Sequence, residues 1–364
     1  AFQLNQEELL KFSNKKILIL CGQGSQHVSL KRTLIDFNKN SNVVVLNENT
    51  SGLNDPSFVN CIDRALNSID NKSAKRYTPD IIITIGGAIV SKKIKAFFIK
   101  NAPKYHIAIH PKEIGTDLFL RRDAYYNCNA SDFLSFLNKK ATLLNTLNFK
   151  ASWNQVDFQI KDSLSSYFNK QSNHTDLHAF NALYHTLPEN CTLHLGNSSI
   201  VRYMQLFDPI KDIQYECNRG TSGIDGCTST AVGCAIASPN RQHIFISGDI
   251  SFIYDSNALW ISPFPRNLKM IVIDNKGGGI FKIIDGSKTS KQLERYFEAK
   301  HEADASSIAR GFGINVYEAN QSHDYQEQLI NFFQDEHAQL LVLETDSTEN
   351  PTDLHLFFKH LKNA

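Results

Sequence analysis

Two short polar segments carry the residues of this chain best suited to chemistry. The first is Gly248-Asp249-Ile250-Ser251-Phe252, and the second runs from Asp274 through Asn275 into the glycines Gly277–Gly279. A carboxylate, an amide oxygen and a backbone carbonyl are the hard ligands that Mg²⁺ prefers, and phosphate oxygens and water complete its octahedron. These residue types therefore predict a metal site that holds a phosphorylated ligand.

Each segment directly follows an apolar run that predicts a buried strand, His243–Ser247 and Leu268–Ile273. Ligands of an open parallel sheet collect at the carboxyl ends of its strands. A helix predicted over Ile250–Leu259 begins at the same point, and its N-terminus favours an anion there. Taken alone, Asp249 could instead be a helix cap or turn residue, and Asn275 a turn residue before the glycines.

Two more predicted strands end in polar, glycine-containing loops. Cys191–Leu195 leads into Gly196-Asn197-Ser198-Ser199, with Arg202 one turn into the next helix, and Ile213–Cys217 leads into the loop 218–231, which contains Arg219. An arginine fork matches a carboxylate with two hydrogen bonds and stays charged at any working pH. The alternative for both arginines is a surface position or a loop salt bridge.

Apolar strands alternate with helical segments along the whole chain, which predicts parallel α/β sheets covered on both faces. We expect two Rossmann-like domains, residues 1–165 and 166–364. The first half also contains a predicted helix over Ser131–Leu147 and a helical linker that begins near Phe149. Its predicted strands are Lys15–Cys21, Val43–Leu46, Asp80–Ile85 and His106–His110.

Composition limits the class of protein. Lys and Arg number 38 against 37 Asp and Glu, so the net charge of +1 gives no general attraction to nucleic acid or membrane. The apolar runs are too short to span a bilayer. Seven cysteines without a C-x-x-C pair fit a reducing cytosol. We therefore expect a cytoplasmic protein that binds neither nucleic acid nor membrane.

A second possible ligand site lies in the first half, where Gly22-Gln23-Gly24 follows a strand. The triplet lacks the third glycine of the dinucleotide motif, and Glu48 near the end of the next strand sits in a polar loop. A tight turn is the simpler interpretation. A non-catalytic α/β module that binds a nucleotide here remains an alternative for the whole chain.

The four strand-and-loop units of the second half, in this order, resemble the diphosphate-binding domain of thiamine-diphosphate enzymes. In detail, the runs Arg219–Ala231 and Gly277–Phe281 are similar to the family of 2-succinyl-5-enolpyruvyl-6-hydroxy-3-cyclohexene-1-carboxylate (SEPHCHC) synthases. Asp80–Phe97 resembles that family's central domain. The resemblance implies a transferase of menaquinone biosynthesis that decarboxylates 2-oxoglutarate and joins the succinyl semialdehyde unit to isochorismate. Another thiamine-diphosphate decarboxylase or synthase remains an alternative.

The resemblance also implies roles for individual residues. Asp249, Asn275 and the Gly277 carbonyl would bind Mg²⁺ or Mn²⁺. Ile224 would be the wedge that bends thiamine diphosphate, and the other cofactor contacts would come from Gly248, Ser251, Ile280 and Phe281. Ser198, Arg202 and Arg219 would act on the substrates as catalytic residues, and the substrate pocket would also include Phe281 and Ile284.

Members of the family carry a further pyrimidine-binding domain whose glutamate bonds to the cofactor's N1′ atom. No glutamate of this sequence takes that role: Glu7 and Glu8 belong to a terminal helix. We therefore expect this 364-residue chain to be inactive alone, and the intact protein to be a homodimer or homotetramer.

Overall fold

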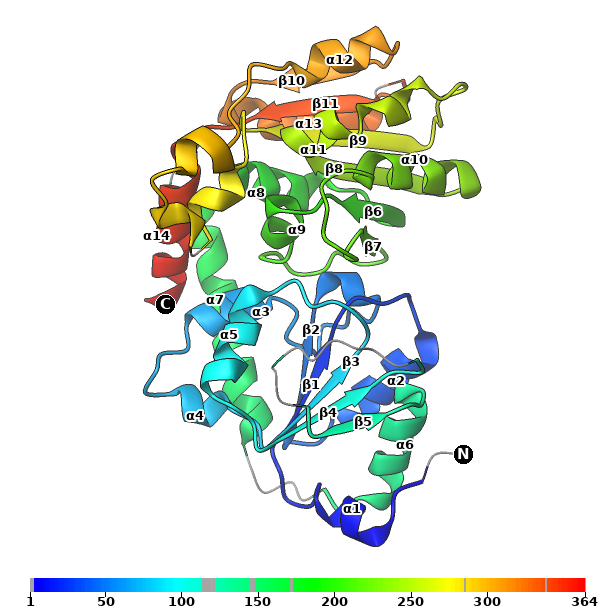
Figure 1. Ribbon diagram of the computed structural model, residues 1–364, viewed down its shortest axis with the longest axis vertical. Coiled ribbons are helices and arrows are strands. Elements are labelled where there is room, and N and C mark those ends of the chain that lie inside the picture. The colour runs from blue at the N-terminus through cyan, green and yellow to red at the C-terminus, as the bar shows by residue number, and fades with distance from the viewer. Residues whose placement is uncertain are drawn as a thin grey trace. The chain divides into compact units, whose positions relative to one another are not determined.

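The computed structural model describes residues 3–112, 119, 122–143, 148–170, 173–284, 286–337 and 339–363. The chain divides into two compact units. Unit 1 contains Ala1–Leu164 with His360–Ala364, and unit 2 contains Ser165–Lys359. Each unit is built on one parallel sheet flanked by helices (Figure 1). The predicted α/β class with two parallel-sheet domains is confirmed.

The sheet of unit 1 has the strand order β2-β1-β3-β4-β5, and every pairing in it is parallel. Its strands are β1 (Ile17–Cys21), β2 (Val43–Asn47), β3 (Ile81–Ile85), β4 (Tyr105–Ile109) and β5 (Ala124–Tyr126). The first three are buried along their whole length, as their unbroken apolar sequences predict. The sequence did not predict β5, because it has only three residues and all of them are half-buried.

The helices of unit 1 are α1 (Gln6–Leu10), α2 (Val28–Phe37), α3 (Ile62–Asn67), α4 (Ala74–Tyr77), α5 (Lys92–Lys100) and α6 (Ala130–Lys140). The prediction of a helix to Leu147 was too long, since α6 ends at Lys140; residues 144–147 lie outside the described part. The expected linker is the helix α7 (Phe149–Phe168). Its Trp153 is fully buried against Tyr77, so its first half belongs to the core of unit 1.

The sheet of unit 2 has the order β10-β11-β9-β8-β6-β7 and is also parallel throughout. Its strands are β6 (Cys191–Leu195), β7 (Gln214–Cys217), β8 (Gln242–Gly248), β9 (Leu268–Asp274), β10 (Val316–Ala319) and β11 (Leu340–Glu344). Alternate residues of the central strands, such as Phe245 and Met270, share one apolar cluster with Ala231 and Ala309. Small helix residues thus allow close packing on the sheet.

The helices of unit 2 are α8 (Asp176–Thr186), α9 (Ser199–Met204), α10 (Cys227–Ala237), α11 (Asp249–Tyr254), α12 (Ala305–Gly311), α13 (Tyr325–Gln334) and most of α14 (Asn350–Lys362), whose last residues, from His360, belong to unit 1. The helix predicted over Ile250–Leu259 is interrupted. Asp255 leaves the helical conformation at the end of α11, and a 3₁₀ turn follows. The Asp255 carboxylate instead accepts the backbone N–H of Ser229 at 2.7 Å, near the start of α10.

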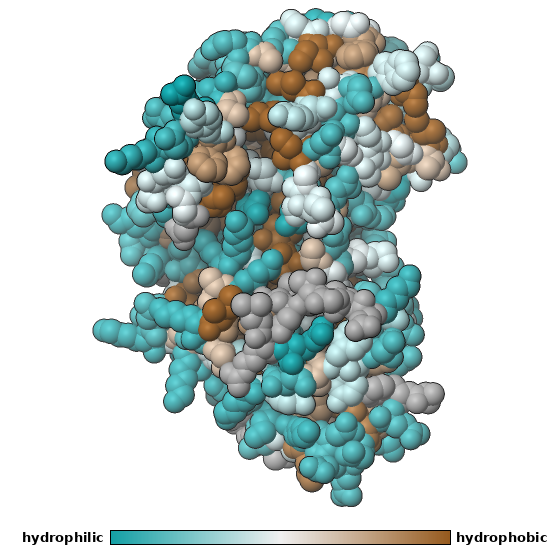
Figure 2. Space-filling view, in the orientation of Figure 1, coloured by the Kyte–Doolittle hydropathy of each residue, from teal (hydrophilic) through white to brown (hydrophobic). Residues whose placement is uncertain are grey.

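The face of the molecule drawn in Figure 2 is mostly hydrophilic, with apolar residues scattered among the polar ones. Exposed large apolar side chains include Tyr254, Trp260 and Phe158. Within the described ranges, no helix is both long enough and apolar enough to cross a membrane.

Candidate functional site

The carboxyl ends of β6, β7, β8 and β9 lie at one edge of the unit 2 sheet, because these neighbouring strands are all parallel. A cavity of about 410 Å³ opens there. The loops after all four strands line it, although they are far apart in the sequence. All the site residues predicted from the sequence lie on this cavity: Ser198, Arg202, Arg219, Ile224, Gly248, Asp249, Ser251, Asn275, Gly277, Ile280, Phe281 and Ile284.

Asp249 and the glycine loop are in direct contact. The Asp249 side chain is buried, and its Oδ2 accepts the backbone N–H of Gly277 at 2.9 Å. Its Oδ1 accepts the N–H of Ile250 at 2.7 Å, at the start of α11. The loop after β9 is thereby held against the end of β8.

Asn275 presents an unused acceptor. Its Nδ2 donates to the Asp176 carboxylate at 3.2 and 3.4 Å, whereas its buried Oδ1 has no hydrogen-bond partner in the described part of the chain. Asp176 is itself held by Thr345 Oγ1 at 2.7 Å and Asn350 Nδ2 at 2.9 Å. This network fixes the orientation of the Asn275 amide, with Nδ2 toward Asp176 and Oδ1 away from it. A buried acceptor without a partner is costly, so a ligand at Oδ1 would stabilise this arrangement.

The electrostatics around Asp249 favour a cation. Burial raises the pKa of the Asp249 carboxyl above its ordinary value, and the nearby Asp274 carboxylate raises it further. Lys276 Nζ lies 2.6 Å from Asp274 Oδ2, and His301 Nε2 lies 3.3 Å from Asp249 Oδ2. No three His, Cys, Asp or Glu side chains form a metal-ligand cluster among the described residues. A single carboxylate with amide and carbonyl oxygens is instead a set suited to Mg²⁺.

The two arginines reach the cavity from neighbouring loops. Arg202, in α9, donates to the carbonyl of Ser198, which has a positive φ of 72°. Arg219 is 9% exposed, and its Nη1 donates to Asn197 Oδ1 at 2.7 Å. Its Nε is buried without a hydrogen-bond partner among the described residues. Arg219 therefore retains a donor for an anionic ligand.

Asn197 joins the loops of the site together. Its side chain is buried, and its Nδ2 donates to the carbonyls of Asn218 at 2.6 Å and Gly223 at 2.7 Å. Its Oδ1 accepts from Arg219. One amide thus connects the loop after β6 with the beginning and the middle of the arginine-containing loop after β7.

Apolar side chains form the remaining walls. Ile224 is half-buried within a polar loop, and its carbonyl accepts the Ser251 hydroxyl at 2.5 Å. This bond occupies the Ser251 hydroxyl proton. Ile280 and Phe281 lie in the 3₁₀ turn η3 (Gly279–Lys282), and Ile284 follows it.

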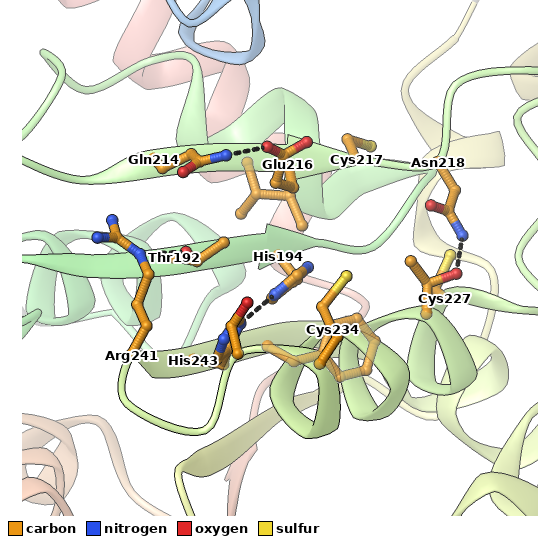
Figure 3. A pocket seen from close by; sticks show the side chains of 15 residues that line it. Thr192, His194, Gln214, Glu216, Cys217, Asn218, Cys227, Cys234, Arg241 and His243 are labelled. Carbon is orange, nitrogen blue, oxygen red and sulfur yellow. Dashed lines mark hydrogen bonds between the residues drawn. The ribbon is translucent and has the colours of Figure 1, made fainter. Parts of the chain in front are cut away.

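A second cavity, of about 270 Å³, lies between β6, β7, β8 and α10 (Figure 3). Its polar side chains largely satisfy one another. His194 Nε2 and His243 Nδ1 are 3.0 Å apart, and burial lowers the pKa of His194 to about 4. Arg241 donates to Thr192 Oγ1 at 2.6 Å and to a backbone carbonyl. None of the predicted site residues lines this cavity.

In unit 1, the glycines of Gly22-Gln23-Gly24 serve packing. A Cβ on Gly22 would lie 2.4 Å from the Gly87 carbonyl oxygen, and one on Gly24 would lie 3.0 Å from the Ser51 carbonyl oxygen. The Glu48 carboxylate is buried and accepts two backbone N–H groups of the 90–91 segment at 2.8 Å. It is therefore already satisfied, whereas a ribose-binding carboxylate must be open to the ligand.

One segment of the chain is similar to a known protein family. Residues 196–344 match the family model of the thiamine pyrophosphate enzyme C-terminal TPP-binding domain; thiamine pyrophosphate is thiamine diphosphate. This segment of unit 2 is similar to the TPP-binding domain of thiamine-diphosphate enzymes. The matched segment contains every residue of the predicted site. The similarity to individual relatives also includes unit 1, because it extends over nearly all 364 residues of this chain.

The chain is 37% identical over 361 residues to the SEPHCHC synthase of Flavobacterium johnsoniae. This similarity covers 98% of this chain and 64% of that relative. It is 36% identical to the SEPHCHC synthase of Flavobacterium psychrophilum, covering 95% of this chain and 62% of the relative. It is 33% identical to the SEPHCHC synthase of Bacteroides fragilis, with 83% of this chain and 53% of the relative covered. The chain thus spans less than two thirds of the length of these relatives.

Several residues of this candidate site were not predicted from the sequence. Asp176 lies 99 positions from Asn275, and its place at the start of an ordinary amphipathic helix gave no signal. Asn197 was visible inside the Gly-Asn-Ser triplet after β6, a position that could have indicated its role. Glu298 and His301, beside the glycine loop, belong to a polar segment without a recognisable motif.

Proposed function

We propose that this chain forms the cofactor-binding and substrate-binding part of an SEPHCHC synthase, a transferase of menaquinone biosynthesis. The reaction decarboxylates 2-oxoglutarate and joins the remaining four-carbon unit to isochorismate. The observation that supports it most is the convergence of a metal-type ligand set and two arginines on one cavity. The similarity to three curated SEPHCHC synthases points the same way.

In this proposal Asp249, Asn275 and the Gly277 carbonyl hold Mg²⁺ or Mn²⁺. The partnerless Oδ1 of Asn275 fits a metal ligand, and a cation beside Asp249 offsets the burial of its carboxylate. The Gly277 carbonyl accepts one N–H at 3.0 Å and keeps a second lone pair. When bound through this metal, thiamine diphosphate supplies the electron sink that decarboxylation requires.

The substrates are dicarboxylates, and the cavity offers two guanidinium groups for them. Arg219 donates to Asn197 through one nitrogen and keeps its buried Nε available for a carboxylate. Arg202 lines the same cavity one turn after Ser198. Ile224, Phe281 and Ile284 exclude water around these charges, which strengthens each charge-assisted hydrogen bond.

Two alternatives are weaker. A thiamine-diphosphate enzyme acting on pyruvate needs one carboxylate partner, whereas this cavity holds both Arg202 and Arg219. A nucleotide-binding module at Gly22-Gln23-Gly24 lacks room, because backbone atoms already fill the space beside Gly22.

We also propose a cytoplasmic homodimer or homotetramer that binds neither membrane nor nucleic acid, on the basis of the net charge of +1. No glutamate is among the described residues that line the cavity, so in this proposal the group that bonds to the cofactor's N1′ atom comes from elsewhere. We therefore expect the 364 residues alone to bind the cofactor without turnover.

The test is substrate discrimination by the complete protein that contains this chain, supplied with thiamine diphosphate and Mg²⁺. Wild-type protein should decarboxylate 2-oxoglutarate in preference to pyruvate. Arg219→Lys should raise the KM for 2-oxoglutarate by about tenfold or more, because a lysine cannot replace a bidentate fork. Lys359→Met, at an exposed helix position that does not line the cavity, is the control. Equal use of both oxoacids by wild-type protein would contradict the proposal.

A further inference from the structure

A five-residue segment of unit 2, Phe297–His301, lies against the predicted metal site, and we name it the strap. The Glu298 carbonyl accepts the backbone N–H of Gly278 at 2.5 Å. At the end of the strap, His301 Nε2 is 3.3 Å from Asp249 Oδ2. At its beginning, the Phe297 and Phe281 rings have their centres 5.6 Å apart.

The strap approaches the glycine loop so closely that side chains there would collide with it. A Cβ on Gly277 would lie 2.9 Å from the Glu298 carbonyl oxygen. One on Gly278 would lie 3.1 Å from the Phe297 carbonyl oxygen and 3.2 Å from that of Glu298. The consecutive glycines therefore permit a close backbone contact with the strap.

Glu298 holds the glycine loop at two points. Its side chain is fully buried, and its Oε1 lies 2.6 Å from Lys282 Nζ at the end of η3. Lys282 also donates to the Ser347 carbonyl at 3.1 Å, and Lys300 Nζ lies 3.7 Å from Glu298 Oε2. The backbone of Glu298 therefore binds Gly278, and its carboxylate binds the residue directly after Phe281.

We propose that Glu298, through its ion pair with Lys282, is a positioning residue that fixes the glycine loop for metal and cofactor binding. This inference rests on the proposed function, since it assigns Gly277 to the metal and Phe281 to the cofactor. Removing the partner of a buried carboxylate strongly destabilises a protein. The folded chain therefore favours the geometry in which Glu298 and Lys282 stay paired. That geometry determines where the Gly277 carbonyl lies relative to Asp249 and Asn275.

The experiment measures thiamine diphosphate binding to the chain by calorimetry over a series of Mg²⁺ concentrations. Glu298→Gln should raise the half-saturating Mg²⁺ concentration roughly 10- to 100-fold, the usual effect of removing a residue that orients metal ligands. Lys282→Arg keeps the ion pair and should stay within about threefold of wild type. Glu294→Gln removes an exposed carboxylate of the preceding segment and should change nothing.

Far-UV circular dichroism and thermal unfolding without ligand establish that each variant is folded. A purely structural role would lower the unfolding temperature and leave the Mg²⁺ dependence of folded molecules unchanged, which would overturn the inference. If Glu298→Gln does not fold, Gly278→Ala pushes the strap away without altering charge, and it should raise the Mg²⁺ requirement in the same way. Wild-type Mg²⁺ dependence in Gly278→Ala would then overturn the inference. Absence of Mg²⁺-dependent binding by the wild-type chain would overturn the proposed function and this inference together.

Discussion

Replacing Asn197 by alanine tests how the arginine-containing loop is held. The buried Asn197 amide makes three hydrogen bonds of 2.6 to 2.7 Å, two to backbone carbonyls and one from Arg219. A neutral hydrogen bond contributes about 1 kcal/mol and one to a charged group about 2 kcal/mol. Asn197→Ala should therefore destabilise unit 2 by about 4 kcal/mol and leave the Arg219 guanidinium without its anchor.

Hydrogen-exchange mass spectrometry is the suitable assay, because it measures the opening free energy of unit 2 peptides separately from those of unit 1. Asn257→Ala removes an exposed amide from the same unit and should cost less than about 0.5 kcal/mol. A loss below about 1 kcal/mol for Asn197→Ala would refute the reasoning that this amide joins the loops.

Two further predictions concern unit 1. Burial raises the pKa of Glu48 from 4.5 to about 7. Between these pH values the folded state therefore binds more protons than the unfolded state, so the stability of unit 1 should fall by about 3 kcal/mol as the pH rises from 4.5 to 7. Glu48→Gln should flatten this dependence, measured by urea unfolding across that pH range; an unchanged slope would contradict it. Gly22→Ala should lower the stability of unit 1 by about 1 to 3 kcal/mol in hydrogen exchange, because its Cβ meets the Gly87 carbonyl at 2.4 Å. The control is Gly233→Ala in α10, where the added Cβ meets no atom within 4 Å, and it should not destabilise unit 2. Equal stability of the two variants would contradict the packing role of Gly22.

The sequence predicted the central part of the fold because continuous apolar runs leave few alternatives to buried parallel strands. Leu268–Ile273, for example, forms all of β9 except its last residue. Parallel strands also place their following loops at one edge, so the loops containing Asp249 and Asn275 were predictable as neighbours. Helix ends were less predictable: α11 ends early because Asp255 bonds to Ser229, a tertiary contact that no local pattern reveals.

The supporting residues of the site depend on long-range contacts and were not predictable. Asp176 orients Asn275 across 99 residues, and a lone aspartate at a helix start has many possible uses. Glu298 lies in a short irregular segment whose polar composition favours an exposed loop, yet its side chain is fully buried beside Lys282. Only the folded chain shows that a carboxylate at this position has a cationic partner.

The most direct test of the central claim is a calorimetric titration of the chain with thiamine diphosphate, with and without Mg²⁺, beside Asp249→Ala. We predict saturable binding by the wild-type chain that requires Mg²⁺ and that the substitution abolishes, because Asp249 supplies the only carboxylate on the cavity among its described lining residues. Binding that is independent of Mg²⁺, or that Asp249→Ala retains, would contradict the claim that this cavity is a metal-dependent diphosphate site.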